Sequence, residues 1–168
     1  MPNPRKPFRL NVGFIIHEEV GYTHEIPFDF DKANLGDDLE LTQFTGSVHI
    51  GRTPQGLVVQ GKFSGETGLE CVRCLKAFAR PLSWELTELY AFNKKSVSES
   101  GLILAEDAHI DLQPLLREYA LLEVPISPIC KPDCNGLCPV CGQDLNVRDC
   151  GHRPHEEESP FSTLKKLL

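Results

Sequence analysis

The chain has 168 residues, of which 40% are hydrophobic and 24% charged, a balance typical of a globular protein with one core and a small appended module. It contains no apolar run of about 18 residues, and its first ten residues lack the apolar region of a secretory signal. We therefore expect a cytoplasmic protein that does not enter a membrane. The net charge of −7 argues against binding to nucleic acid through phosphate contacts alone.

The N-terminal third of the chain predicts β-strands. Two strand-like pieces cover residues 8–16 and 22–30, and a polar loop follows over residues 31–38. Apolar residues then alternate with polar neighbours over residues 39–50, which is the period of a half-buried strand. The next strand is expected after the turn sequence Thr53-Pro-Gln-Gly56.

Strand character persists as far as residue 92, interrupted by the turn Cys71-Val-Arg-Cys74. Strands joined by such short turns predict an antiparallel meander. Residues 93–108 show no clear period and predict a long loop. A helix is expected over residues 111–123, because Asp111 can cap its first amides and Pro114 falls in its first turn.

Five of the seven cysteines lie within residues 130–152. The segment Cys138-Pro-Val-Cys141-Gly142 is typical of a zinc knuckle: the proline fixes φ, and the glycine admits the left-handed conformation that aims amides at sulfur. A reducing compartment favours metal over disulfides or free thiols. We predict a structural Zn²⁺ site with four ligands, drawn from Cys130, Cys134, Cys138, Cys141, Cys150 and His152.

The pair Cys71 and Cys74 has three interpretations. Metal binding is a weaker expectation for this pair than for the candidate ligands of residues 130–152. It could be a redox pair, two small buried side chains in a tight turn, or half of a zinc site. Seven cysteines and His152 make eight possible ligands, enough for two tetrahedral ions. Equally, Cys71 and Cys74 could share one ion with Cys138 and Cys141.

A short final helix is predicted from Ser159-Pro160 onward, too short to stand without docking on the core or on a partner. The expected fold class is therefore α+β: an antiparallel β-meander or hairpin sheet, one packing helix, a zinc-knuckle loop and this final helix. The expected domains are residues 1–125 and residues 126–168, the second packed on the first.

The only locally basic window surrounds the first cysteine pair. Arg73, Lys76 and Arg80 could contact phosphates, and Phe78 could stack on a base. An ordinary charged turn beside a core aromatic is the alternative that composition favours. The other histidines follow no ligand or triad spacing, and no nucleophile elbow or Gly-rich phosphate loop occurs. We therefore expect neither enzymatic activity nor a small-molecule substrate.

Several phrases together resemble the YceD-type family of bacterial and plastid proteins, over roughly residues 45–168. They are Leu69-Glu-Cys-Val-Arg-Cys-Leu75, Ile110-Asp-Leu112 before the helix, the Leu-x-x-Pro-x-x-Pro-x-Cys phrase of residues 122–130, Cys134-Asn-Gly-Leu-Cys-Pro-Val-Cys-Gly-Gln-Asp-Leu-Asn146, and the final Pro160-Phe-x-x-Leu-x-x-Leu. Family members that end the cluster with Cys-x-Cys differ from this chain, which has Cys150-Gly-His152, a substitution that zinc tolerates.

The resemblance implies a non-enzymatic role in large-subunit ribosomal RNA processing or accumulation, and hence in ribosome assembly. The implied partners are ribosomal RNA, a large-subunit ribosomal protein or an assembly factor. Because some relatives keep the Cys-x-Arg-Cys turn without most of the later cluster, the resemblance favours a self-contained zinc site in residues 130–152. The alternative function is a zinc-dependent redox sensor or chaperone, in which oxidation releases the metal. A metallohydrolase, which needs an open metal position, is third.

Overall fold

The structure is a computed structural model that describes residues 6–152. The chain divides into two compact units, Met1–Leu69 with Phe78–Ile126 and Glu70–Ala77 with Ser127–Leu168, of which only those residues are described. The turn Cys71–Cys74 thus belongs to the same unit as the C-terminal cysteines. The domains expected from the sequence, 1–125 and 126–168, stay a prediction.

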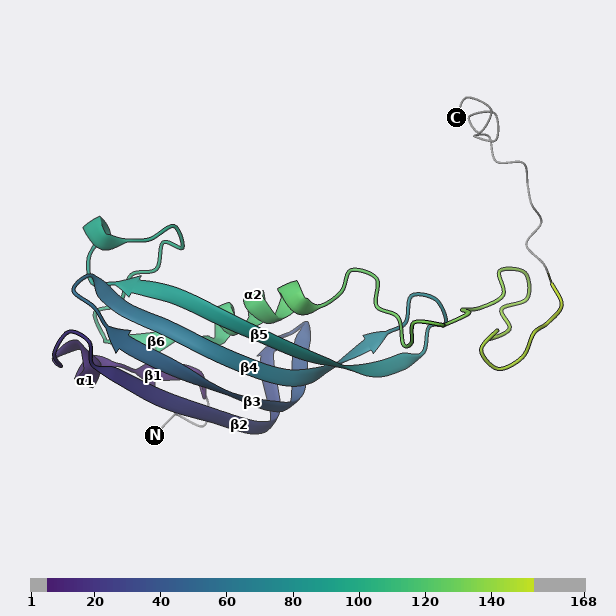
Figure 1. The fold of residues 1–168 in the computed structure, drawn as a ribbon, viewed down its shortest axis with the longest axis horizontal. Coiled ribbons are helices and arrows are strands. Elements are labelled where there is room, and N and C mark those ends of the chain that lie inside the picture. Colours follow the sequence, from purple (N-terminus) through teal and green to yellow (C-terminus); the bar gives the residue numbers. More distant parts are fainter. Residues whose placement is uncertain (1–5, 153–168) are drawn as a thin grey trace, which may run out of the picture. The chain divides into compact units, whose positions relative to one another are not determined.

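The first unit is built on a four-stranded antiparallel sheet in the order β2-β3-β4-β5 (Figure 1). Its strands are β2 (Thr23–Gly36), β3 (Leu39–Arg52), β4 (Gly56–Glu70) and β5 (Ala77–Ala91). Buried residues alternate with exposed ones along each strand, so one face packs on the core and the other faces solvent. The predicted meander is confirmed.

The predicted turn between β3 and β4 is also confirmed. The amide of Thr53 donates to the carbonyl of Gly56 at 2.9 Å, and the Thr53 hydroxyl accepts from the Gly56 amide at 3.1 Å. A bulge elsewhere in β3 shifts the register between Thr42 and Thr45, where Gln43 adopts a φ of 52°.

The predicted loop over residues 31–38 is wrong in most of its length, because β2 continues to Gly36. Ala33 and Leu35 are buried on the core side of this extension, and Ala33 pairs with Leu41 of β3. Polar residues alternate with them and face outward, so the segment has the period of a strand behind its polar composition.

The predicted strand over residues 8–16 is also wrong in its second half. Only β1 (Arg9–Asn11) is extended, and it pairs with β6 (His109–Asp111) in a small second sheet. The single turn α1 (Gly13–Ile16) follows. The Asn11 carboxamide accepts from the Gly13 amide at 3.0 Å, a local bond that ends the strand.

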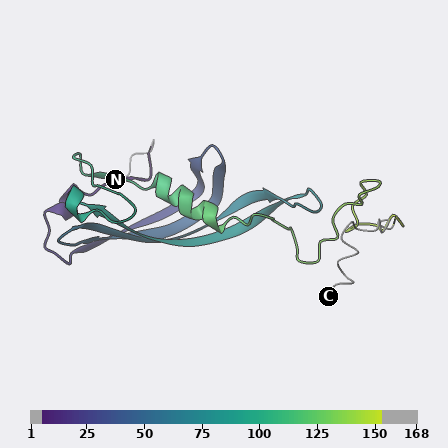
Figure 2. The same ribbon diagram turned by 90° about the horizontal axis from the view of Figure 1, so that it is seen from above.

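The helix α2 (Gln113–Glu123) lies across one face of the sheet (Figure 2). It buries Leu115, Leu116 and Ala120 in the core. The helix begins at Gln113 rather than at the predicted Asp111, which ends β6, and the Asp111 carboxylate accepts from the Gln113 amide at 3.0 Å. The helix is the one substantial helix among residues 6–152, so the fold is mostly β, which corrects the α+β expectation.

The predicted loop over residues 93–108 is confirmed in outline. It holds one 3-10 turn, η1 (Lys94–Ser96), and a single bridge from Ile103 to Ala91. The predicted final helix lies outside the described residues. In the part of the chain that the structure describes, no helix has the length and apolar character needed to cross a membrane.

Candidate metal centres

The second unit gathers the seven cysteines and His152 into two groups of four, and within each group the ligand atoms lie within 4.8 Å of one another. The first cysteine group consists of Cys71, Cys74, Cys130 and Cys134. The second cysteine group consists of Cys138, Cys141, Cys150 and His152. All eight predicted ligands are thus brought together, but in two sets rather than around the single local site that the sequence favoured.

The spacing of the sulfurs in the first cysteine group suits a tetrahedral metal. The Sγ atoms of Cys71 and Cys134 lie 3.8 Å apart, and those of Cys74 and Cys130 lie 3.7 Å apart. A zinc ion bound by four thiolates at about 2.3 Å places its sulfurs roughly 3.8 Å from one another. All seven cysteines are free thiols, so neither group is linked by a disulfide.

Residues 71–76, the first knuckle, present one cysteine pair. The amide of Leu75 donates to the Cys71 carbonyl at 2.8 Å, and the amide of Cys71 donates to the Lys76 carbonyl at 2.9 Å. The turn extends the hairpin between β4 and β5, and the Val72 amide fastens it to the Pro128 carbonyl at 2.9 Å. The hairpin therefore delivers Cys71 and Cys74 to the segment that carries the other two ligands.

Residues 138–143, the second knuckle, repeat the same bonds. The amide of Gly142 donates to the Cys138 carbonyl at 2.9 Å, and the amide of Cys138 donates to the Gln143 carbonyl at 2.8 Å. The left-handed position of the turn is Gly142 here, with a φ of 73°, and Leu75 in the first knuckle, with a φ of 58°. The two turns are therefore the same backbone turn built from different residues, and each presents two candidate metal ligands.

The knuckle amides favour the thiolate at the first cysteine of each turn. Burial raises the pKa of Cys71, but hydrogen bonds from backbone amides, including those of Cys130 and Cys74, bring it down to about 6. The amides of Cys141 and Val140 likewise lower the pKa of Cys138 to about 6. One thiolate in each group is therefore available near neutral pH to begin metal binding.

Two other thiols of the first cysteine group, those of Cys130 and Cys74, hold their protons more tightly. Burial raises the pKa of Cys130 to about 12, and hydrogen bonds with the neighbouring cysteines add to the effect. The pKa of Cys74 is also raised: the amide of Lys76 lowers it, but burial and the sulfurs of Cys71 and Cys134 outweigh that amide. A divalent cation removes this cost because it replaces the protons and neutralises the crowded sulfurs.

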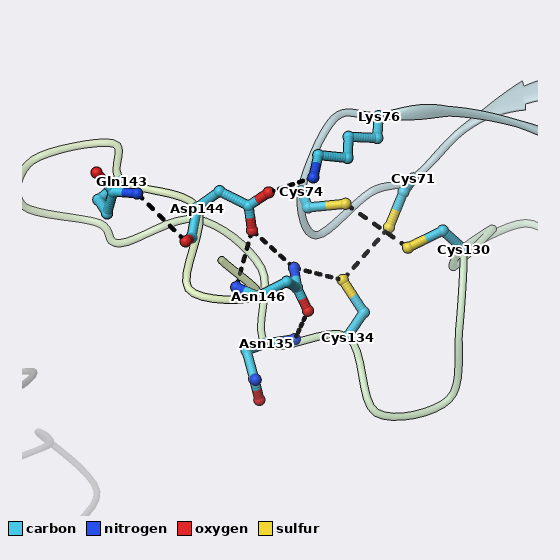
Figure 3. A network of polar contacts seen from close by, with 9 residues as sticks. All are labelled: Cys71, Cys74, Lys76, Cys130, Cys134, Asn135, Gln143, Asp144 and Asn146. Atoms are coloured by element: carbon cyan, nitrogen blue, oxygen red, sulfur yellow. Dashed lines mark hydrogen bonds and ion pairs between the residues drawn. The ribbon is translucent and has the colours of Figure 1, made fainter. Parts of the chain in front are cut away.

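Asp144 and Asn146 connect the loop of the second cysteine group to the first cysteine group (Figure 3). Asp144 forms a 2.6 Å ion pair with Lys76 of the first knuckle, which lowers the pKa of the Asp144 carboxyl to about 2. The carboxamide of Asn146 donates to Asp144 at 2.8 Å and to the Cys134 sulfur at 3.5 Å, and it accepts from the Asn135 amide at 2.9 Å.

The residues predicted to contact RNA fall in both units, Arg73 and Lys76 in the second and Phe78 and Arg80 in the first. Lys76 is paired with Asp144, and Arg73 donates to the Cys134 carbonyl at 2.9 Å, so both hold the second unit together. Phe78, half-buried, and Arg80, exposed, belong to β5 of the first unit. Direct RNA contact at these four residues stays a prediction.

The roles of Asp144 and Asn146 were missed from the sequence. Both stand in the Asp-Leu-Asn phrase of the family motif, so the motif marked them without saying what they contact. Their partners Lys76 and Cys134 come from two other segments. The signal that could have identified them is a pair of polar residues in the sequence between Cys138/Cys141 and Cys150/His152, the two ligand pairs of the second cysteine group.

The family model of the large ribosomal RNA subunit accumulation protein YceD matches residues 59–168. The chain belongs to the YceD family. The resemblance seen in the sequence motifs is thereby confirmed.

Similar proteins come from bacteria and plants. An uncharacterised protein of Mycobacterium tuberculosis is 32% identical over 161 residues, covering 92% of this chain and 74% of the relative. The uncharacterised YlbN of Bacillus subtilis is 29% identical over 107 residues, 62% of each chain. A chloroplastic large ribosomal RNA subunit accumulation protein YCED homolog of Zea mays is 40% identical over 65 residues, 38% of this chain and 22% of the relative. No solved structure matches the chain.

Proposed function

We propose that this YceD-family chain is a non-enzymatic, cytoplasmic factor that supports processing and accumulation of large-subunit ribosomal RNA during ribosome assembly, and that structural Zn²⁺ holds its second unit together. The family match over residues 59–168, which includes all eight candidate ligands, carries the proposal. The name of the maize relative, which refers to accumulation of this RNA, supports it.

The ligand count supports a structural role for the metal. Each cysteine group offers four protein ligands, which fill a tetrahedral zinc ion and leave no position for water or substrate. Hydrolytic zinc sites in proteins keep three protein ligands and one open position. Thiolates select zinc over the harder cations, and the reducing compartment that we propose keeps these cysteines free to bind it.

The local charges favour a protein partner over direct phosphate contact at the first knuckle. The Lys76 charge is compensated by Asp144, and Arg73 is engaged with the Cys134 carbonyl. The chain as a whole has a net charge of −7, which suits a basic partner such as a large-subunit ribosomal protein. An assembly factor of basic charge fits the same argument.

The test is the ratio of large-subunit to small-subunit ribosomal RNA in cells that lack this chain. We expect the ratio to fall on deletion, to recover with the wild-type chain, and to stay low with Cys71→Ser/Cys74→Ser expressed at the same level. The substitution Ser83→Ala, at an exposed position of β5 away from the cysteines, serves as the control and should restore the ratio. An unchanged ratio after deletion would refute the proposal.

The redox alternative makes a different prediction about the metal. The low pKa of Cys71 and Cys138 favours it, because a thiolate is the form that reacts with peroxide. A sensor would release zinc and form disulfides under mild peroxide, with parallel loss of structure in the second unit. A structural site would keep its zinc under the same treatment, which metal analysis after oxidation measures directly.

A further inference from the structure

The two cysteine groups differ in how well they are shielded from solvent. In the first group, Cys71, Cys74 and Cys134 are at most 4% exposed, and Cys130 is half-buried. In the second group, Cys138 is buried, Cys150 is half-buried, and both Cys141 and His152 are exposed. A competing ligand reaches a metal through its exposed ligands, so the two groups should release a bound ion at different rates.

The two groups are also connected, through side chains in the loop of the second group. Asp144 and Asn146 stand between Cys141 and Cys150, inside the loop that a metal in the second group would close. Asp144 forms an ion pair with Lys76 of the first knuckle, and Asn146 donates to the sulfur of Cys134 in the first group (Figure 3). The second group's loop thus supplies outer contacts for the first group's ligands.

We propose that the two groups are coupled zinc sites of unequal lability, in which the exchangeable zinc of the second group controls how firmly the first group retains its own. The inference rests on the zinc binding of the proposed function. Zinc in the second group closes the loop and places Asn146 against Cys134. When that zinc leaves, the loop regains its conformational freedom, and the first site loses its sulfur hydrogen bond.

Exchange of bound zinc in the full-length chain against excess free, isotopically enriched zinc tests this proposal, because the excess keeps the second group occupied while the first group exchanges. We expect two zinc ions per wild-type chain, exchanged in a fast and a slow phase. The variant Cys138→Ser/Cys141→Ser should bind one ion and exchange it roughly tenfold or more faster than the wild-type slow phase, because the loop is no longer closed. Exchange of this remaining ion at the wild-type slow rate would overturn the coupling.

A second variant leaves every ligand in place. Asn146→Ala should keep two zinc ions and the fast phase, while the slow phase accelerates by roughly tenfold to a hundredfold, as is typical of outer-shell changes. Asn135→Ala is the matched control, since Asn135 enters the network through its backbone amide, and its slow phase should match wild type. An unchanged slow phase in Asn146→Ala would contradict the inference.

Cobalt substitution separates this positioning role from a general loss of structure. The thiolate-to-Co²⁺ charge-transfer band of the four-sulfur site should move to longer wavelength in Asn146→Ala, because the Cys134 sulfur loses a donor. A band at the wild-type position would overturn the role of Asn146. A chain that binds no zinc would refute both proposals, whereas an unchanged ribosomal RNA ratio in the deletion cells would refute only the function.

Discussion

The two knuckles share one backbone design but differ in what surrounds them. Both have the same pair of backbone hydrogen bonds and a left-handed residue after the second cysteine. Cys74 of the first knuckle is 4% exposed, whereas its counterpart Cys141 is exposed. The turn alone therefore brings a cysteine pair together, while in our proposal burial and the contacts of Asp144 and Asn146 set how long a bound metal stays.

The largest difference between the knuckles should appear when each loses its cysteines. In Cys71→Ser/Cys74→Ser, the buried first site is lost, and we expect the second unit to become fully sensitive to protease while the sheet keeps its circular dichroism signal. In Cys138→Ser/Cys141→Ser, cleavage should be confined to the loop of the second cysteine group. Equal protease sensitivity in the two variants would contradict the account.

A glycine beside the first knuckle provides the next test. Gly136 has a φ of 75°, and an added Cβ would lie 2.9 Å from the Arg73 carbonyl oxygen. Gly151 has a φ of 74° with nothing within 4 Å. In thermal unfolding of the zinc-bound chain, we expect Gly151→Ala to lower the free energy of unfolding by about 1–2 kcal/mol and Gly136→Ala to lower it by about 2–4 kcal/mol. Both changes strain the backbone, but only Gly136→Ala adds a clash. Equal costs would show that the first knuckle does not pack on Gly136.

The ion pair between Lys76 and Asp144 should matter less than the sulfur contact of Asn146. Lys76→Met removes the charge that positions Asp144 but keeps the apolar stem, so we expect the slow phase of zinc exchange to accelerate by less than in Asn146→Ala. The double variant Lys76→Met/Asp144→Asn should accelerate the slow phase little more than either single change, since both changes break the same ion pair. Additive effects would mean that the two residues act separately.

The smallest effect should come from exchanging the left-handed residues of the two knuckles. Gly142→Leu places a side chain at a φ of 73° and should cost about 1–2 kcal/mol in unfolding free energy. Leu75→Gly relieves the same strain at 58°, but glycine gains freedom in the unfolded chain, so the net gain should be below about 1 kcal/mol. A marked loss in Leu75→Gly would show that the leucine side chain has a stabilising contact.

The second knuckle could be predicted from sequence because its chemistry is local. Pro139 and Gly142 stand at the positions where the turn needs a fixed and a positive φ. The first knuckle has Leu75 at the corresponding position, so its turn carried no such signal. Its partners Cys130 and Cys134 lie beyond β5, a long loop and α2, and only the folded chain brings them to Cys71 and Cys74.

The difference between local and long-range signals also explains which strands could be predicted from the sequence. The meander could be predicted because apolar residues alternate with polar ones in β3, as in Leu39-Glu40-Leu41 and Val48-His49-Ile50. The extension of β2 could not be predicted, because the polar composition of residues 31–38 concealed the buried Ala33 and Leu35. The predicted strand over residues 8–16 is wrong in its second half, because the side chain of Asn11 turns the backbone after three extended residues.

Metal content per chain, measured on the wild type and on Cys138→Ser/Cys141→Ser, tests the central claim of two four-ligand sites most directly. The two cysteine groups predict two zinc ions in the wild type and one in the variant. A single zinc ion in the wild type that disappears in the variant would contradict the claim and restore a self-contained site within residues 130–152. Absence of zinc from both proteins would show that neither cysteine group is a zinc site.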